Sequence, residues 1–326
     1  MVPPLPLRPW RLGFGVPVIE RGECSALPGG ALTKRKYLVE KAALTKVLFD
    51  TTAASLRPGM NLSGRKALLT GATGGLGRAI ALALAQGGAQ IALSARKREA
   101  LEELAAELPG SGHTVLPADL AEPDAAERLA AEASGTEILI ANAGLPAAGR
   151  LADFSPDQVK RALRVNLEAP MLMARALYPS MVEAGSGHLV FVASLSGKAP
   201  SPRTSIYNAT KFGLRGFALG LRGDLAPKGI GVSLVSPGFV REAGMFADAG
   251  SKPPPGMGTT TPDQVGKATV KAIENNKAEV AVAPLQQRAA AHFALVNPSL
   301  SVKAQSGSTG QKAAEAIAKG HPADKR

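Results

Sequence analysis

Apolar and polar positions alternate in blocks along the middle of the chain. Between residues 65 and 285, short runs of apolar residues are separated by longer stretches with helical periodicity. Continuous apolar runs, in which the side chains on both faces of the strand are apolar, are typical of strands covered on both faces of a parallel sheet. The predicted strands are "KALLTG" (66–71), "QIALSA" (90–95), "HTVLPA" (113–118), "EILIAN" (137–142), "HLVFVAS" (188–194), "GVSLVSPG" (231–238) and "AEVAVAP" (278–284).

Helical stretches lie between these runs. They are predicted at 75–87, 97–108, 122–134, 157–184, 205–226 and 262–276. Strands that alternate with helices indicate βαβ units, and therefore an α/β protein with a doubly wound parallel sheet of about seven strands and helices on both faces. We expect one such domain at residues 61–285. Residues 1–60 are predicted to be a disordered or partly helical extension, and residues 286–326 to be partly helical and then mobile.

The composition is that of a globular protein with an aliphatic core. Hydrophobic residues make up 45% of the 326 residues and aromatic residues only 4%. Cys24 is the single cysteine, which excludes an internal disulfide and a cysteine-based metal site. The four histidines show no metal-ligand spacing, so no metal is predicted. No apolar run reaches the roughly 18 residues that suggest a membrane span, and we expect a cytoplasmic protein.

The positive net charge lies mainly at the two ends of the chain. The net charge is +12; residues 1–60 and 251–326 each contribute +5, and the segment between them only +2. Because no module of basic and aromatic residues accompanies this charge, no nucleic-acid partner is expected. The basic ends leave open a weak attraction to anionic surfaces, including membranes.

A glycine-rich turn follows the first predicted strand and opens the first helix. The stretch "LLTGATGGLGRAIALAL" contains Gly71, Gly74, Gly75 and Gly77. Glycine lets backbone N–H groups approach a ligand closely, and the start of a helix offers unpaired donors and the positive end of its dipole. A turn of this kind in a βαβ series favours binding of a dinucleotide pyrophosphate.

A tyrosine and a lysine lie one helical turn apart in "SIYNATKFG". Tyr207 and Lys211 are at positions i and i+4, so they share one face of the predicted helix. A free phenol has a pKa of about 10 and is a poor base at neutral pH. A nearby ammonium favours the phenolate and lowers that pKa. We therefore predict that Lys211 prepares Tyr207 for acid–base catalysis. Ser194, at the end of "HLVFVAS", can donate a hydrogen bond to a substrate carbonyl.

These motifs together resemble the short-chain dehydrogenase/reductase family over roughly residues 62–283. The glycine turn has the spacing T-G-x-x-x-G-x-G of that family, and "ANAG" (141–144) is similar to its N-N-A-G. The resemblance implies a Rossmann fold, a catalytic set of Asn166, Ser194, Tyr207 and Lys211, and a homodimer or homotetramer. It implies cofactor contacts from Thr70, Gly71, Thr73, Gly75, Leu76, Gly77, Arg96, Asp119, Leu120, Asn142, Ala143, Gly144, Tyr207, Lys211, Pro237, Gly238 and Val240.

The end of the second predicted strand indicates which cofactor is used. In "IALSARKRE", Ala95 stands where family members that prefer NAD carry an aspartate, and Arg96, Lys97 and Arg98 follow. Arg78 lies just after the glycine turn. Cations at this position favour the additional phosphate of NADP, so NADP is predicted, with NAD as the alternative. One departure from the family is Glu242, which replaces a threonine that usually contacts the cofactor.

The resemblance implies an enzyme that acts on the CH–OH group of donors. Residues 241–262 read as a lid with two methionines, a phenylalanine and a Pro-Pro-Pro run, which suggests an apolar or acyl-bearing substrate. The first hypothesis is an NADP-dependent oxidoreductase that interconverts a ketone or aldehyde and an alcohol. The alternatives are a nucleotide-binding sensor or scaffold without turnover, and a membrane-associated reductase of lipid carbonyls.

Overall fold

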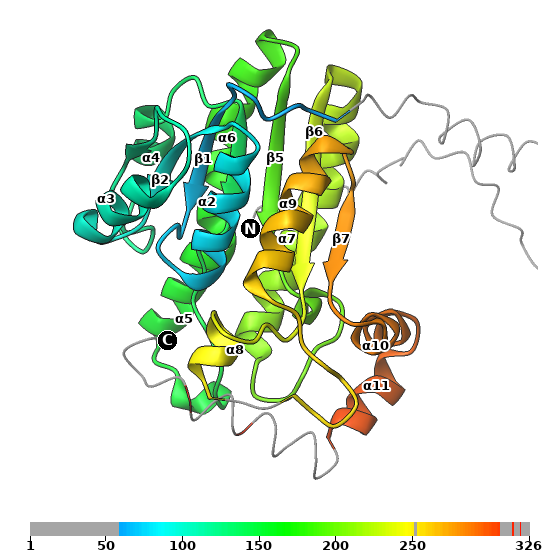
Figure 1. The fold of residues 1–326 in the computed structure, drawn as a ribbon. Coiled ribbons are helices and arrows are strands. Elements are labelled where there is room, and N and C mark those ends of the chain that lie inside the picture. Colours follow the sequence, from blue (N-terminus) through cyan, green and yellow to red (C-terminus); the bar gives the residue numbers. More distant parts are fainter. Residues whose placement is uncertain (1–58, 251–252, 307–314, 316–319, 321–326) are drawn as a thin grey trace, which may run out of the picture. The chain divides into compact units, whose positions relative to one another are not determined.

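A seven-stranded parallel sheet forms the centre of the molecule (Figure 1). The computed structural model describes residues 59–250, 253–306, 315 and 320. The strand order is β3-β2-β1-β4-β5-β6-β7. The strands are β1 (Lys66–Thr70), β2 (Gln90–Ser94), β3 (Thr114–Val115), β4 (Ile138–Ala141), β5 (Gly187–Val192), β6 (Ile230–Pro237) and β7 (Glu279–Val282).

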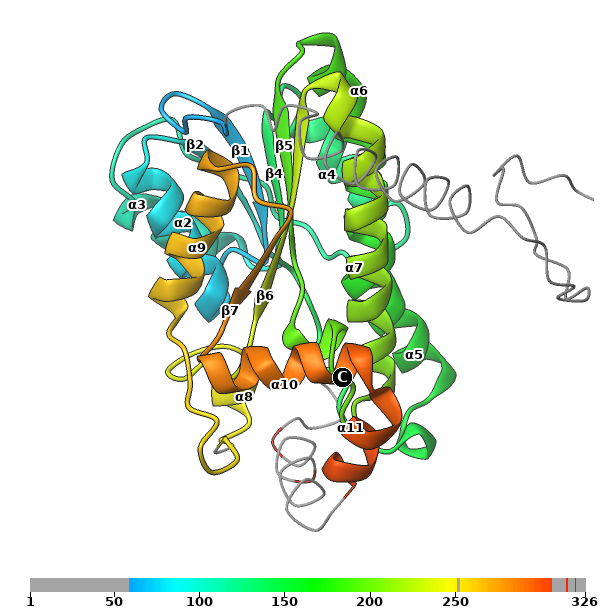
Figure 2. The same ribbon diagram turned by 90° about the vertical axis from the view of Figure 1, so that its right-hand side faces the viewer.

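Helices cover both faces of this sheet (Figure 2). One apolar core joins the sheet to α2 (Gly75–Gln86), α3 (Arg98–Glu107) and α9 (Pro262–Glu274). A second core joins the other face to α4 (Ala125–Glu132), α6 (Ala169–Glu183) and α7 (Ser205–Leu225). The strands β4, β5 and β6 are buried along their whole length, because helices pack on both of their faces.

The remaining helices lie near the carboxyl ends of the strands. They are α5 (Pro156–Leu163), α8 (Met245–Asp248), α10 (Leu285–Val296) and α11 (Pro298–Gln305). Short 3₁₀ turns are η1 (Leu151–Asp153), η3 (Leu195–Gly197) and η4 (Ala226–Lys228).

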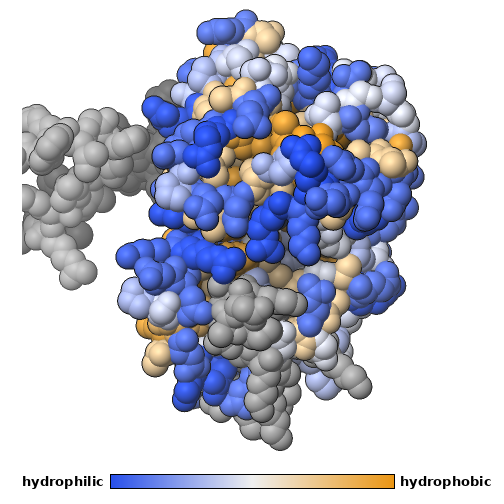
Figure 3. All heavy atoms as spheres, turned by 90° about the vertical axis from the view of Figure 1, so that its left-hand side faces the viewer, coloured by the Kyte–Doolittle hydropathy of each residue, from blue (hydrophilic) through white to orange (hydrophobic). Residues whose placement is uncertain are grey.

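Local sequence explains where several helices begin. Thr261 accepts a hydrogen bond from the backbone N–H of Gln264, whose side chain in turn accepts one from the N–H of Thr261, and this capping box starts α9. Ser155 and Gln158 form the same arrangement at the start of α5. Hydrophilic residues cover most of the face that carries α3 and α4, as expected for the solvent side of amphipathic helices (Figure 3).

The predicted fold class and the order of elements are confirmed. Each apolar run contains a strand, and the doubly wound parallel sheet has the seven strands expected. One difference concerns the predicted helix at 157–184. A π-helical turn, η2 (Arg164–Glu168), divides it into α5 and α6. Such turns often occur at functional sites.

Both predicted extensions lie partly outside the described residues. Residues 1–58 and most of residues 307–326 are not described, so the predictions for them stay predictions. In the second extension, the structure describes α10 (Leu285–Val296) and α11 (Pro298–Gln305). Within the described part of the chain, no helix has both the length and the apolar character needed to cross a lipid bilayer.

Candidate active site

A cavity of about 620 Å³ lies at the carboxyl ends of the strands. Its wall includes the ends of β1, β2, β5 and β6 together with parts of the loops that follow these strands and β4. Ligands of open α/β sheets bind at this edge, and the volume is within the usual range for small-molecule sites. All 17 residues predicted to contact a cofactor line this cavity.

The glycine turn forms one end of the cavity. Gly71 has a φ of +64°, which glycine adopts without strain. A Cβ atom at Gly77 would overlap the carbonyl oxygen of Gly71, so only glycine lets the helix start so close to the turn. Helix α2 follows the N-cap residue Gly74, with no side-chain cap and no acidic residue in its first turn. This helix start is therefore suited to bind an anion.

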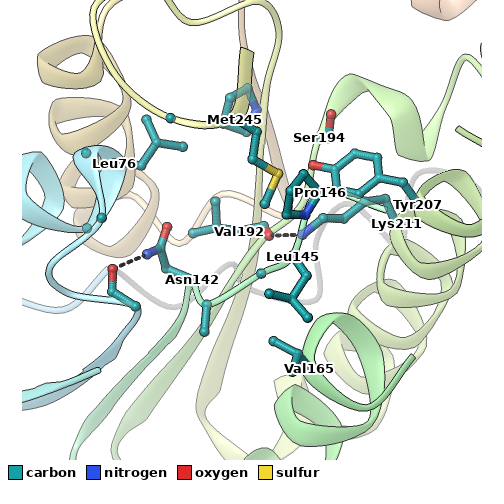
Figure 4. A pocket seen from close by; sticks show the side chains of 18 of the residues that line it. Leu76, Asn142, Leu145, Pro146, Val165, Val192, Ser194, Tyr207, Lys211 and Met245 are labelled. Carbon is teal, nitrogen blue, oxygen red and sulfur yellow. Dashed lines mark hydrogen bonds between the residues drawn. The ribbon is translucent and has the colours of Figure 1, made fainter. Parts of the chain in front are cut away.

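Hydrogen bonds join the glycine turn to the end of β4. The hydroxyl of Thr70 accepts from the backbone N–H groups of Asn142 and Ala143, both at 3.1 Å. The side-chain amide of Asn142 donates to the carbonyl oxygens of Thr70 and Gly71, at 3.0 and 3.2 Å. Asn142 thus fixes the turn from beside the cavity (Figure 4).

Two of the four basic residues near the end of β2 and the glycine turn line the cavity. Arg96 and Lys97 belong to its wall. Arg78 is not a lining residue; its guanidinium pairs with Glu107 at 2.5 Å. Arg98 also lies outside the lining and approaches Glu102 at 3.7 Å. Arg96, the one of these four predicted as a cofactor contact, thus lines the cavity, whereas Arg78 and Arg98 lie near acidic residues of α3.

Ser194, Tyr207 and Lys211 meet on the opposite wall of the cavity (Figure 4). Ser194 follows the buried strand β5, and its Oγ accepts from the N–H of Ser196 at 3.1 Å. Lys211 is 3% exposed, and its Nζ donates to the carbonyl oxygen of Val192 at 3.0 Å. The same Nζ lies 5.6 Å from the centre of the Tyr207 ring. Helix α7 thus presents both side chains to the end of β5.

Burial has opposite effects on the two titratable groups. Apolar surroundings raise the pKa of Tyr207 to about 12, and a hydrogen bond with Ser194 acts in the lowering direction. Burial lowers the pKa of Lys211 to about 8. The sequence predicted a tyrosine pKa lowered by Lys211, and this is not what the structure shows. Tyr207 is half-buried in the cavity wall, and the loss of solvation of its phenolate is the largest effect on its pKa.

Asn166 lies in the π-helical turn and does not line the cavity. Its side chain is 1% exposed. Its Oδ1 accepts from the N–H of Leu145 at 2.6 Å, and its Nδ2 donates to the Leu145 carbonyl at 3.0 Å and to Thr210 Oγ1 at 3.4 Å. The amide therefore connects the segment after β4 to α7, one residue before Lys211.

The segment after β6 completes the cavity. Pro237, Gly238 and Val240 line it as predicted. Arg241 and Glu242 form an ion pair at 2.8 Å and are both exposed. Glu242 has a φ of +74°, a backbone conformation that residues other than glycine rarely adopt.

Several lining residues were not named from the sequence. Leu145 and Pro146 give the cavity an apolar side together with Met245 and Phe246 of the predicted lid, and Gln287 reaches the cavity from α10. The apolar residues after β4 could have been found from their position after a strand end. Gln287 follows the last strand, in an alanine-rich segment that carries no motif.

Comparisons with known proteins agree with this architecture. A family model described as short chain dehydrogenase matches residues 65–253. The "Ketoacyl reductase HetN" of Nostoc sp. is 36% identical over 227 residues, which cover 68% of this chain and 79% of that protein. The Drosophila melanogaster "Dehydrogenase/reductase SDR family protein 7-like" is 33% identical, with 73% and 78% covered.

A solved structure extends this similarity to three dimensions. The short-chain dehydrogenase of Sphingobium yanoikuyae in complex with NADPH superposes with a TM-score of 0.64 at 29% identity, covering 72% of this chain and 93% of that one. The family model, at residues 65–253, spans the glycine turn and the helix that carries Tyr207 and Lys211. On the family model, the relatives and the shared fold, this chain is an oxidoreductase of the short-chain dehydrogenase/reductase family.

Proposed function

We propose that the protein is an NADP-dependent oxidoreductase that interconverts a ketone or aldehyde with the corresponding alcohol, on an apolar or acyl-type substrate. One observation supports this most directly. Ser194, Tyr207 and Lys211 lie together on one wall of a cavity whose far end is the glycine turn. A nucleotide held at that turn and a carbonyl beside Tyr207 would share one continuous space.

The residues present fit a phosphorylated dinucleotide. The uncapped start of α2 suits a pyrophosphate, and Arg96 and Lys97 lie where an additional phosphate is expected. Ala95 offers no carboxylate that would repel this phosphate. The structure of the Sphingobium relative contains NADPH. When bound, the reduced cofactor supplies the hydride for carbonyl reduction.

The proton for this reduction would come from Tyr207. With a pKa of about 12, the phenol is protonated at neutral pH and can donate to the carbonyl oxygen as it receives negative charge. The hydroxyl of Ser194 would donate a second hydrogen bond to the same oxygen and stabilise that charge. Lys211, charged below about pH 8, adds a positive charge beside the ring.

Asn166 would act as a positioning residue in this scheme. Its hydrogen bonds with Leu145 and Thr210 hold the cavity wall against the helix that carries Tyr207 and Lys211. Because Asn166 is buried behind the wall, its substitution should displace both catalytic side chains rather than remove a contact to the substrate.

The substrate side of the cavity is mostly apolar. Leu145, Pro146 and Met245 lie near Tyr207 in the close-up view (Figure 4). Phe239 packs on Phe246 with ring centres 4.7 Å apart. Such a wall favours a ketone with apolar substituents or an acyl chain. The name of the Nostoc relative supports a 3-oxoacyl substrate as the first compound to test.

The test compares carbonyl reduction by wild type, Tyr207→Phe and Tyr178→Phe. NADPH consumption is followed by absorbance with 3-oxoacyl thioesters and bulky ketones, and NADPH binding by fluorescence. Tyr207→Phe should lose about 10²–10⁴-fold in kcat while still binding NADPH, because only the proton donor is removed. Tyr178 lies on α6 in the second core and serves as the matched control. NADPH binding without oxidation of NADPH in wild type, over the whole panel, would favour the sensor alternative.

The exposed apolar residues of α10 and α11 support a second candidate, a reductase of lipid carbonyls at a membrane surface. Val296 is 85% exposed and Leu285 73%, and residues 285–306 contain basic but no acidic side chains. These features suit an anionic bilayer surface. Wild type should then pellet with vesicles containing phosphatidylserine in low salt, and a Phe293→Ser/Val296→Ser double variant should not. Equal pelleting of both proteins would exclude this candidate.

A further inference from the structure

The loop between β6 and α9 covers one side of the cavity and is closed at its base. Here the lid means the described residues of this loop, 239–250 and 253–260, which overlap the segment 241–262 that the sequence predicted as a lid. Val240 forms a parallel bridge with Thr260, and backbone hydrogen bonds join Thr260 to Phe239 and Arg241, both at 2.9 Å. Val240 and Thr260 are almost completely buried. The two ends of the lid are therefore joined by backbone hydrogen bonds.

The side chain of Gln287 binds both ends of the lid. Its Oε1 accepts from the backbone N–H of Phe239 at 3.1 Å. Its Nε2 donates to the carbonyl oxygens of Met257 and Gly258, at 3.1 and 2.9 Å. The residue is 5% exposed, and it comes from α10, beyond the end of the sheet. A single carboxamide thus satisfies one donor and two acceptors of the lid backbone.

Glycine at position 238 makes room for this contact. A Cβ atom there would overlap Oε1 of Gln287 and lie 2.9 Å from Cβ of Ala283. Gly258, with a φ of +64°, packs on Pro284 just before α10. The start of α10 and the base of the lid are therefore fitted to each other.

The far part of the lid reaches the cofactor side of the cavity. Ala243 lies so close to Gly75 that a Cβ atom added at Gly75 would overlap the Cβ atom of Ala243. Gly244 lies beside Leu76. The side chain of Met245 extends toward Gly144 (Figure 4). The lid thus connects α10 at its base with the glycine turn at its tip, and it crosses the cavity between them.

We propose that Gln287 is a positioning residue that holds the lid over the cavity and thereby determines the affinity for the carbonyl substrate. The effect on substrate affinity rests on the proposed function, whereas the role of Gln287 in holding the lid does not. The residue lies outside residues 65–253, which match the family model, and was not expected from any motif. We expect Gln287 to affect substrate binding rather than the chemical step, because its carboxamide hydrogen-bonds to the lid backbone and not to the reacting groups.

Gln287→Met and Gln286→Met form a matched pair for the test. Methionine keeps the length and volume of glutamine but offers no strong hydrogen-bonding group. Gln286 is the exposed neighbour on the same helix, so its substitution controls for changes in α10 itself. Gln287→Glu keeps an acceptor for Phe239 but, as a carboxylate, cannot donate to the two carbonyl oxygens.

The first readout is amide hydrogen exchange of the full-length protein without ligands. In Gln287→Met, exchange of the Phe239 amide and of amides in 257–260 should increase at least about tenfold, because their local opening no longer breaks the Gln287 hydrogen bonds. Gln286→Met should match wild type. Gln287→Glu should release 257–260 more than Phe239. Unchanged exchange in Gln287→Met would overturn the structural part of the proposal, whatever the enzyme activity.

The second readout is steady-state kinetics with the best carbonyl substrate and saturating NADPH. We expect KM to rise about tenfold in Gln287→Met, which corresponds to about 1.4 kcal/mol, while kcat changes less than about twofold. A merely structural role would lower the amount of active enzyme and reduce kcat with KM unchanged, and this result would refute the positioning role. If wild type reduces no carbonyl, the proposed function fails, while the exchange result still decides the role of Gln287.

Discussion

Acidification should destabilise the protein through His188, a buried histidine in β5 that the proposed reaction does not use. The side chain is 2% exposed, and its Nε2 lies 2.8 Å from Oγ of Ser233. Burial lowers the pKa of His188 from 6.5 to about 3, and the positive charge of Arg222 acts in the same direction. The folded protein thus keeps this imidazole neutral under conditions in which an unfolded chain protonates it.

The sign and size of the effect follow from these two pKa values. Between about pH 6.5 and pH 3 the unfolded state binds more protons than the folded state, so the free energy of unfolding decreases as the pH falls. With a pKa of 6.5 unfolded and about 3 folded, the loss at about pH 5 is about 2 kcal/mol relative to neutral pH. This is a large part of the stability of a typical domain.

Urea unfolding at about pH 7.5 and about pH 5 measures this loss. The comparison protein is His188→Leu, which removes the titrating group. The substitution also changes stability at neutral pH. The change in the free energy of unfolding between the two pH values is therefore measured within each protein, and these two changes are then compared. Carboxylates contribute little in this window. For Glu137 and Glu279, hydrogen bonds from cationic neighbours outweigh burial and place the pKa below its ordinary value of 4.5.

Wild type should lose about 2 kcal/mol more than His188→Leu between the two conditions. Equal losses in both proteins would show that His188 is protonated in the folded state or is reached by water. Either result would contradict the dry environment that the structure gives to the interior of the sheet.

Three further predictions concern the site. Above about pH 8, kcat/KM for reduction should fall as Lys211, whose pKa burial lowers to about 8, loses its charge; Lys211→Arg should move this fall to higher pH. Arg96→Glu should reduce the preference for NADPH over NADH by about tenfold to a hundredfold, measured as the ratio of kcat/KM values. The proposed charge-assisted hydrogen bond from Arg96 to the additional phosphate of NADPH would be replaced by repulsion between that phosphate and a carboxylate. Gly75→Ala should weaken NADPH binding and displace the lid, because the new methyl group overlaps Ala243; adding Ala243→Gly should restore the hydrogen-exchange protection of the lid, and no restoration would refute the contact.

The sequence determined the order of elements and the type of site. Apolar runs such as "HLVFVAS" predict covered strands wherever they lie, because burial on both faces requires apolar residues on both sides. The glycine turn and the pair Tyr207 and Lys211 are local patterns, since their geometry depends on a few neighbouring residues. For that reason the fold class could be predicted without a structure, and the resemblance to a family added 17 expected cofactor contacts, all of which line the cavity.

Only the tertiary structure decided which groups are paired and how they titrate. Arg78 meets Glu107 and Gln287 meets Phe239 across 29 and 48 positions of the chain, and no local pattern contains such distances. The pKa of Tyr207 is about 12 rather than below 10, because the cost of removing a phenolate from water depends on everything packed around it. Local residue patterns therefore named the chemical groups of this protein, while the packing of distant segments determined their charge and their partners.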